Sequence, residues 1–132
     1  MIKYLSNCKE LENLYINGFC KDWKKPLDEC AIKSIIKNSQ YSILAVDNKN
    51  VVGIITALSD LINWAFIPYL EVKDDYQGKG IGTDLVQRML DVLADMNCID
   101  LTCDIELQPF YEKFNMLKSN GMVIRRYLSV EK

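Results

Sequence analysis

The stretch YLEVKDDYQGKGIGTDL, from Tyr69 to Leu85, joins an apolar, strand-like run to a segment with helical spacing. Three glycines, Gly78, Gly80 and Gly82, alternate at the junction. Glycine permits positive φ and lets a ligand approach the backbone. The first amides of a helix have no intrahelical partner, and the helix dipole places partial positive charge there. The stretch therefore predicts a strand, an anion-binding loop and a helix. Phosphate is the anion that such a loop most often binds.

The spacing of these glycines excludes two familiar phosphate loops. A P-loop requires G-x-x-x-x-G-K-[ST], but here Lys79 lies between glycines. The dinucleotide fingerprint G-x-G-x-x-G requires a glycine where Thr83 stands. A nucleotide-binding domain of another type stays open as an alternative.

Hydrophobic periodicity on either side of the loop predicts the other elements. Strands are expected at 2–5, 41–46, 51–58, 64–72, 99–105 and 116–128, the last range holding one or two closing strands. Helices are expected at 7–16, 26–36, 80–96 and 109–114. The order β-α-α-β-β-β-α-β-α-β predicts an α/β (α+β) fold, with a mixed, mostly antiparallel central sheet and helices on both faces. Pro68 lies inside the 64–72 strand and predicts an edge, a bulge or a splayed strand there.

Composition limits the classes of function. The 132 residues are expected to form one domain, 1–132, and a net charge of -2 gives no basic field for nucleic acid. No apolar run is long enough for a membrane span, and the N-terminus does not resemble a signal peptide, so a cytoplasmic protein is expected. The chain has five cysteines without C-x-x-C spacing and no histidine, which argues against disulfides and against a metal site.

Two motifs carry a resemblance to a known family. Gln77, Gly80 and Gly82 match the [Q/R]-x-x-G-x-[G/A] pattern, and PFYEKFNM at 109–116 resembles Phe-Tyr-Glu-Lys-Leu-Gly-Phe. Both motifs are similar to those of the GNAT superfamily of acetyl-CoA-dependent N-acetyltransferases. Asn115 replaces the usual glycine of the second motif and Met116 the usual aromatic residue.

The resemblance implies a binding site for acetyl-CoA as co-substrate. The loop amides would hold the pyrophosphate, and the pantetheine arm would pair with strand 64–72 where that strand separates from the next. The residues to which this role is carried over are Leu70, Val72, Gln77, Gly78, Lys79, Gly80, Ile81, Gly82 and Thr83. No metal is implied.

The resemblance also implies the direct attack of an amine on acetyl-CoA in a ternary complex. Tyr111 of the second motif is the candidate acid for the leaving thiolate. Glu71 is the candidate general base, although alternation places it on the face opposite Leu70 and Val72. Alternatives are a water chain and three other carboxylates: Asp60, Asp104 and Glu106. An acyl-enzyme on Cys103 is disfavoured, because no histidine is present to activate the thiol.

The acceptor is expected opposite the CoA arm, bounded by 17–26, by the loop before Trp64 and by the C-terminal strands. The aromatic candidates are Phe19, Trp23, Trp64, Phe66 and Tyr69, and the acidic ones are Asp22, Asp28 and Asp60. An acidic balance favours a small-molecule amine, a protein lysine or an N-terminal amine. The alternatives are a longer acyl group, a non-amine acceptor, or a non-catalytic acyl-CoA sensor or interaction module. A short final hairpin would leave a sheet edge open for a homodimer.

Overall fold

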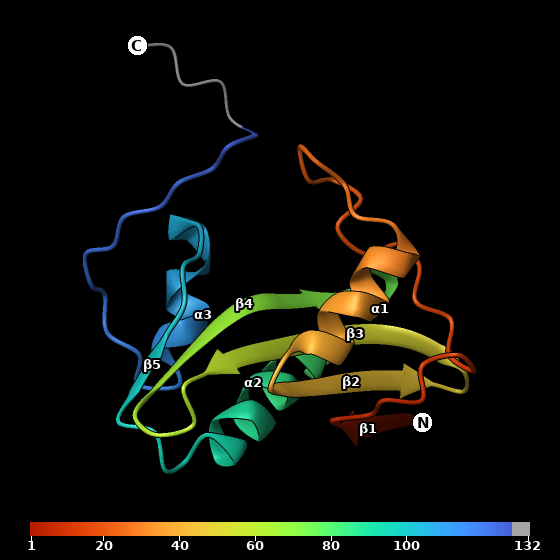
Figure 1. Cartoon of the computed structure of the whole chain (residues 1–132), viewed down its shortest axis with the longest axis horizontal. Helices are drawn as coiled ribbons and strands as arrows, with labels where there is room; N and C mark the ends of the chain where they lie inside the picture. The colour runs from red at the N-terminus through yellow and green to blue at the C-terminus, as the bar shows by residue number, and fades with distance from the viewer. Residues whose placement is uncertain (128–132) are drawn as a thin grey trace.

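The computed structural model describes residues 1–127 of the chain. Its elements are β1 (Ile2–Ser6), α1 (Glu29–Asn38), β2 (Tyr41–Asp47), β3 (Asn50–Ser59), β4 (Trp64–Val72), α2 (Ile81–Val92), β5 (Cys98–Asp100) and α3 (Gln108–Glu112). Short 3-10 turns precede α2 and α3, at Asp74–Tyr76 and Ile105–Leu107. The strands form one sheet in the order β1-β2-β3-β4-β5 (Figure 1), in which β1 to β4 are antiparallel neighbours and β5 is parallel to β4. The predicted mixed α/β fold is confirmed.

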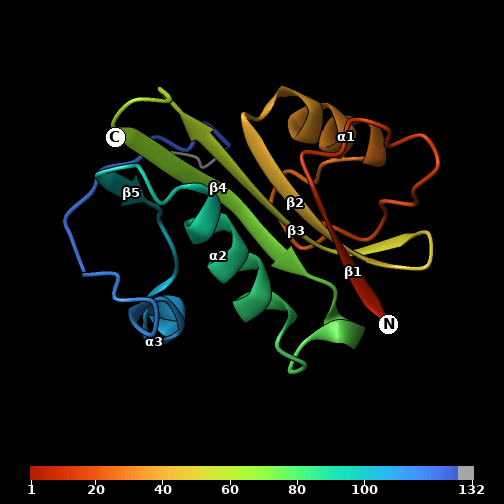
Figure 2. The ribbon, with the colours of Figure 1, turned by 90° about the horizontal axis from the view of Figure 1, so that it is seen from below.

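Helices cover both faces of this sheet, as Figure 2 shows for α1 and α2. The α2 face buries Leu85 and Met89 against the sheet, and residues of α3 pack at its margin. The α1 face buries Ile32 and Ile36 together with the chain before α1. Gly53 of β3 lets α2 approach closely, because a Cβ there would lie 3.0 Å from the Leu85 Cδ1 atom. The sheet therefore separates two apolar cores, one on the face that carries α2 and α3 and one on the face that carries α1.

Pro68 lies at a β-bulge in β4, one of the outcomes that the sequence predicts. Tyr69 pairs with Thr56 and Phe66 pairs with Leu58, so the β4 strand carries one more residue than β3 between these pairs. Proline has no amide to donate to a ladder, which explains why the extra residue falls there. The bulge bends β4 close to the point where β5 leaves it.

The predicted helix at 7–16 is wrong. This segment forms turns, and its Tyr15 makes a bridge to Asn50 at the β2–β3 turn. The Tyr15 amide donates to the Lys49 carbonyl at 2.8 Å, and the Val51 amide donates to the Tyr15 carbonyl at 2.9 Å. These bonds take backbone groups that a helix would have used. Of the apolar residues with helical spacing, Leu11 is buried and Leu14 is partly buried, whereas Tyr15 is exposed.

Two helix boundaries differ from the predicted ones. The helix expected at 26–36 begins at Glu29, because the Asp28 side chain caps it and accepts a hydrogen bond from the Ala31 amide at 2.8 Å. The helix expected at 80–96 ends at Val92, and Leu93 is its C-cap.

The C-terminal strands are the largest correction. β5 covers only three residues, and residues 116–127 form no strand, although their β-branched and aromatic content favours one. Leu128, the last residue of the predicted closing strands, lies outside the described residues. A strand needs a hydrogen-bonding neighbour, and the described part of the chain supplies none for 116–127. Within residues 1–127 no helix has the length and apolarity to cross a bilayer.

Candidate active site

The glycine loop enters α2 with its backbone uncovered. Gly78 and Gly80 have φ values of 76° and 85°, and a Cβ at either position would meet no atom within 4 Å. Gly80 is the N-cap of α2, and its carbonyl accepts the hydrogen bond of the Asp84 amide at 3.0 Å. The amides of 81–83 precede that first intrahelical bond and have no partner within the helix. The loop thus presents a row of donors at the positive end of the helix dipole.

Gly82 brings the two sequence motifs together. A Cβ at Gly82 would lie 3.8 Å from Val72 at the end of β4 and 3.8 Å from the ring of Phe110 in α3. Ile81, the first residue of α2, is buried against the sheet, whereas Lys79 and Thr83 are exposed. Segments far apart in the sequence therefore meet at the start of α2.

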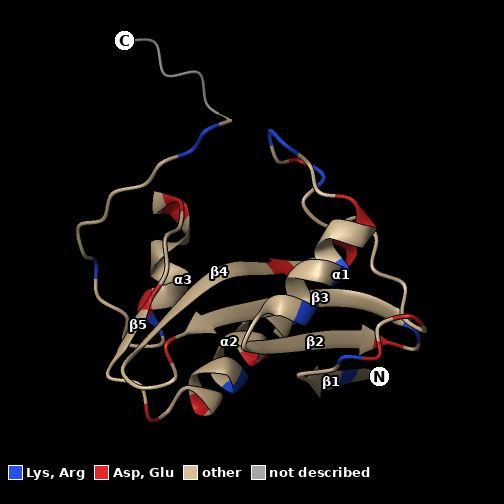
Figure 3. Ribbon diagram, in the orientation of Figure 1, with Lys and Arg blue, Asp and Glu red and all other residues tan. Residues whose placement is uncertain are grey.

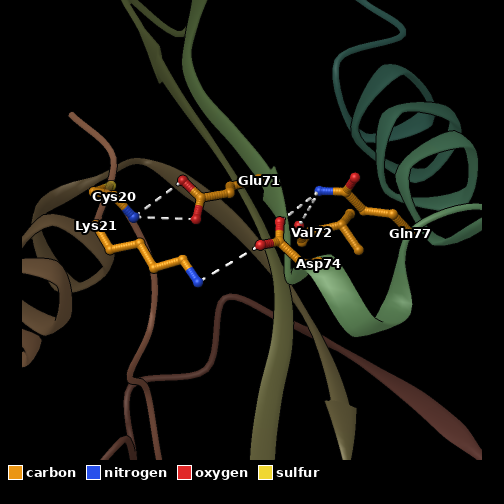
Figure 4. A network of polar contacts seen from close by, with 6 residues as sticks. All are labelled: Cys20, Lys21, Glu71, Val72, Asp74 and Gln77. Carbon is orange, nitrogen blue, oxygen red and sulfur yellow. Dashed lines mark hydrogen bonds and ion pairs between the residues drawn. The ribbon is translucent and has the colours of Figure 1, made fainter.

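Gln77 closes the loop onto the strand that precedes it. Its side-chain amide donates to the Val72 carbonyl at 3.0 Å and to a carboxylate oxygen of Asp74 at 3.4 Å (Figure 4). The side chain therefore positions the loop through its own backbone. Lys79 lies with its ammonium 5.3 Å from the ring centroid of Tyr76, at the outer rim of the loop.

β4 and β5 separate beside this loop. Their parallel pairing is confined to 64–66 on β4, whereas β4 continues to Val72. The later part of β4 therefore keeps an edge that β5 does not cover. Leu70 and Val72 face the α2 core from this part of the strand. An extended ligand would find unpaired backbone groups along the same edge.

Tyr111 lies on α3 at the margin of the α2 core. It is half-buried, and its ring packs edge-on against Phe110 with centroids 5.0 Å apart. Burial, and then the nearby Cys103, raise the pKa of Tyr111 above 10.0. The phenol therefore keeps its proton at neutral pH. Burial, followed by the charge of Asp104, also raises the pKa of the Cys103 thiol, so a reactive thiolate is disfavoured there.

Glu71 points to the opposite face of β4, as alternation predicts. The buried Cys20, which has a positive φ of 58°, donates its amide to both carboxylate oxygens of Glu71, at 3.1 and 3.0 Å (Figure 4). Burial is the main cause of a raised Glu71 pKa, and it outweighs the bonds from Cys20. The charges of Asp22 and Asp74 act in the same direction as burial. The Glu71 carboxylate therefore holds the 18–23 loop against β4. Because its pKa is raised, it also accepts a proton more readily than an exposed glutamate does.

A cavity of about 190 Å³ opens between this loop and the end of β4. Glu71 and Trp23 line it, and the Trp23 ring stacks on Tyr69 with centroids 5.5 Å apart. Lys21 and Asp74 form an exposed ion pair of 3.6 Å across its mouth. The cavity therefore combines an aromatic wall with a carboxylate on the face of β4 away from Leu70.

Other predicted acceptor residues have structural roles or lie elsewhere. Asp28 caps α1, and Asp60 caps a turn by accepting the amides of 62–64, bonds that lower its pKa. Trp64 and Phe66 lie at the β5 end of β4, and Phe19 is buried. Within residues 1–127 no three cysteine or carboxylate side chains gather as a metal site.

The hydrogen-bonded contact between Cys20 and Glu71, called the clasp below, is the feature of the candidate site that sequence reasoning missed. The two residues are 51 positions apart, and Cys20 carries no local signal of a left-handed backbone. Only the packing of the 17–26 segment on β4 brings them together.

The clasp predicts an unusual pH dependence of stability. Because the Glu71 pKa is raised in the folded state, its contribution is fully present at low pH and is lost as pH rises through that pKa. We expect the free energy of unfolding of wild type, relative to Glu71→Gln, to fall as pH rises above the ordinary glutamate pKa of 4.5, as measured in urea titrations.

Glu12→Gln is the matched control. The pKa of Glu12 is lowered, first by a bond to its own backbone and then by Lys37, so the difference from wild type should change in the opposite direction. If the free energy of unfolding of wild type, relative to Glu71→Gln, instead rose with pH, burial would not be the main influence on the Glu71 pKa.

Comparisons with known proteins agree on one family. Residues 8–116 match the sequence model of the Acetyltransferase (GNAT) family. The chain is 24% identical over 129 residues to N-alpha-acetyltransferase 30 of Schizosaccharomyces pombe, covering 87% of this chain and 85% of that protein. A crystal structure from Deinococcus radiodurans R1, provisionally named an acetyltransferase, is 33% identical with a TM-score of 0.88, covering 96% of this chain and 89% of the other.

A more distant structure shares the fold. A GNAT family acetyltransferase from Streptococcus pneumoniae TIGR4 superimposes with a TM-score of 0.73 at 23% identity, covering 96% of this chain and 99% of the other.

Proposed function

Since this chain belongs to the GNAT family of acetyltransferases, we propose that it transfers an acetyl group from acetyl-CoA to a primary amine of a small molecule or protein. One observation carries the proposal. The glycine loop, the uncovered edge of β4 and Tyr111 lie toward the α2 side of the sheet, while Glu71 points from the other face of β4 into a cavity that extends to Val72 and Gln77. Donor and acceptor would thus approach β4 from opposite faces.

The loop fits the pyrophosphate of acetyl-CoA. Its donors are the amides of 78–82, and the open space at Gly78 and Gly80 leaves room for an anion. Lys79 would add a positive charge at the rim. Asp84, the acidic residue of the first turn, has a carboxylate oxygen that accepts the Tyr4 hydroxyl at 2.9 Å, which partly satisfies its charge. Leu70 and Val72 would pair with the pantetheine arm, and Gln77 and Thr83 would border the site.

Bound acetyl-CoA would supply the acetyl group as a thioester. Tyr111 would donate its phenolic proton to the sulfur that leaves, because its raised pKa keeps that proton in place at neutral pH. The half-buried ring would also limit the access of water to the sulfur.

Glu71 would accept the proton that the ammonium group loses before attack, and the second proton, lost from nitrogen as the amide forms, would restore the Tyr111 hydroxyl through water. Alkyl ammonium groups resemble lysine, whose pKa is about 10.4, so the acceptor arrives charged at neutral pH. The raised pKa of Glu71 makes it a better proton acceptor than an exposed carboxylate, and Trp23 beside it offers a face to a cation. Direct attack in a ternary complex is favoured over a Cys103 intermediate, since burial keeps that thiol protonated.

The acceptor class follows from the cavity. Three carboxylates (Asp22, Glu71 and Asp74) and two lysines (Lys21 and Lys73) line it, and this small excess of acidic groups favours a cationic amine. The relative named N-alpha-acetyltransferase 30 supports a protein N-terminal amine within that class. We propose the cytoplasm as the place of action, with residues 1–132 as one catalytic domain. The free state of all five cysteines supports a reducing compartment.

Release of free CoA thiol tests the proposal. The full chain is mixed with acetyl-CoA and a panel of small amines, lysine peptides and peptides with free N-termini, and each product is identified by mass spectrometry. We expect thiol release that matches acetylated amine and that is absent without acceptor. Calorimetric binding of acetyl-CoA without turnover on any amine would instead assign a non-catalytic sensor or interaction module.

A further inference from the structure

Cys20 has a main-chain conformation that its residue type does not favour. Its φ is 58°, in the left-handed region, where the Cβ atom is crowded by the backbone. Of the other four non-glycine residues with positive φ, three are asparagines, the type that best tolerates this conformation. Cys20 is instead 2% exposed and belongs to the core on the α1 face. Strain of this kind persists only where surrounding contacts enforce it, so it directs attention to those contacts.

The left-handed turn aims the Cys20 amide at Glu71. This amide donates to both carboxylate oxygens, at 3.1 and 3.0 Å (Figure 4), and no other residue of 1–127 donates to that carboxylate. The chain on either side of the turn is fixed by packing, since Phe19 is buried in the core and Trp23 stacks on Tyr69. A change of φ at Cys20 would therefore rotate the amide away from Glu71.

No lysine or arginine neutralises Glu71. Among residues 1–127 it belongs to no ion pair. The loop before α1 mixes basic and acidic positions, blue and red in Figure 3. However, both lysines that line the cavity are engaged elsewhere: Lys21 lies 3.6 Å from Asp74, and Lys73 donates to Asn17 at 3.1 Å. The carboxylate is thus oriented by a neutral amide and not by a cation.

Two opposing effects act on this carboxylate. Burial, with the charges of Asp22 and Asp74, raises the Glu71 pKa, whereas the hydrogen bonds from Cys20 lower it. A base must be ionised to accept a proton, so the Cys20 amide keeps more of Glu71 in its active form. A neutral donor does so without a fixed positive charge, which would compete with the ammonium group of an acceptor. One amide shared by two oxygens also leaves their other lone pairs free.

We propose that Cys20 is a positioning residue of the candidate active site, whose left-handed main chain orients the Glu71 carboxylate in the cavity and stabilises its ionised form. The thiol takes no part in the chemistry, because burial, and then the charge of Glu71, raise the pKa of Cys20 to about 12. The inference rests on the proposed function, in which Glu71 accepts a proton from the acceptor.

Wild-type protein tests the contact without any substitution. NMR of protein with isotope-labelled glutamate carboxyl groups and backbone amides follows both partners in one pH titration, and Glu71→Gln assigns the Glu71 signal. We expect the Cys20 amide proton to move downfield as pH rises, with the same midpoint as the Glu71 carboxyl carbon. The physical reason is that the hydrogen bond strengthens as the carboxylate ionises. A Cys20 amide that does not follow Glu71 would overturn the proposal.

Cys20→Val should withdraw the amide, because β-branched residues do not tolerate a positive φ. We expect the Glu71 midpoint and the acid limb of the kcat/KM profile to move together to higher pH by about one unit, since a hydrogen bond to a charged group changes an equilibrium constant about tenfold. On the acid limb kcat/KM should fall about 10-fold, and at higher pH it should return to the wild-type value. A purely structural defect would not be rescued by pH.

Two further variants are the controls. Cys20→Ser keeps an unbranched side chain of similar size, so the amide should stay in place and neither midpoint should rise. Cys30→Val makes the valine change at an exposed cysteine of α1 and should leave both midpoints unchanged. Equal upward movements in Cys20→Ser and Cys20→Val would assign the effect to the thiol and overturn the role of the main chain.

The two readouts separate this inference from the proposed function. A Glu71 midpoint that moves in Cys20→Val while the kcat/KM profile stays fixed would uphold the control of Glu71 by Cys20, and it would show that Glu71 is not the base. A Glu71 midpoint that stays fixed in a folded Cys20→Val would overturn the inference whatever the activity. Far-UV circular dichroism checks the fold of the variant, and if it does not fold, the wild-type titration decides.

Discussion

Gly80→Asp is expected to weaken the binding of CoA by about 100-fold while leaving the fold intact. A carboxylate at this position would lie at the start of α2, where we place the pyrophosphate. Two unit charges about 4 Å apart at an effective dielectric constant of about 20 repel by about 4 kcal/mol, and a 100-fold loss needs only about 2.7 kcal/mol. Isothermal titration calorimetry with CoA measures the change directly.

The matched control is Gly80→Asn, which separates charge from bulk. Gly80 has a φ of 85°, and Asn and Asp are the side chains that best tolerate a left-handed backbone. Asp at a helix N-terminus also interacts favourably with the dipole, so unfolding would not explain a loss of affinity in this variant. We expect Asn to weaken binding far less than Asp. Unchanged CoA affinity in Gly80→Asp would show that the pyrophosphate does not bind at this loop. Equal losses of affinity in Gly80→Asp and Gly80→Asn would show that side-chain bulk, not charge, causes the effect.

Tyr111→Phe is expected to lower kcat by about 100-fold, with KM for acetyl-CoA nearly unchanged. The change deletes one hydroxyl and keeps the ring that packs against Phe110. General acid catalysis contributes roughly 100- to 10,000-fold, so the lower end of that range is a conservative expectation. A loss confined to kcat identifies an interaction made in the transition state. Tyr15→Phe removes an exposed hydroxyl from another part of the chain and serves as the control.

The pH profile gives this variant a second readout. A general acid acts in its protonated form. This form is fully populated well below the pKa of the group and is lost as pH rises through that pKa. Since burial raises the Tyr111 pKa above 10.0, the wild type should lose activity from this group only above pH 10. Tyr111→Phe should lack that alkaline loss. Equal turnover of the two proteins across the pH range would end the acid role of Tyr111.

The centre of the fold was predictable because its signals are local. The glycines between β4 and α2 mark a change of period from strand to helix, and α2 buries Leu85 and Met89, as its spacing predicts. Pro68 has no amide to donate, so a bulge in β4 follows from one residue. In each case the information lies within a few residues of the element.

The ends of the chain were predicted less well because their structure depends on partners. Residues 7–16 have helical spacing, yet the backbone of Tyr15 bonds to the β2–β3 turn. Residues 116–127 have strand composition, yet the described chain offers them no neighbour. Periodicity indicates which side chains are buried, whereas hydrogen bonding between distant segments decides which element forms.

The candidate site divides in the same way. The sequence by itself determined the glycine loop and the place of Tyr111 on a short helix, because residue type and spacing fix where a backbone turns and where a helix begins. Only the tertiary structure decided that Phe110 lies against Gly82, and that Cys20 clasps Glu71 beside a cavity on the other face. The reason is physical: these contacts join segments about 30 to 50 residues apart, and no local preference encodes a packing that a whole sheet must first align.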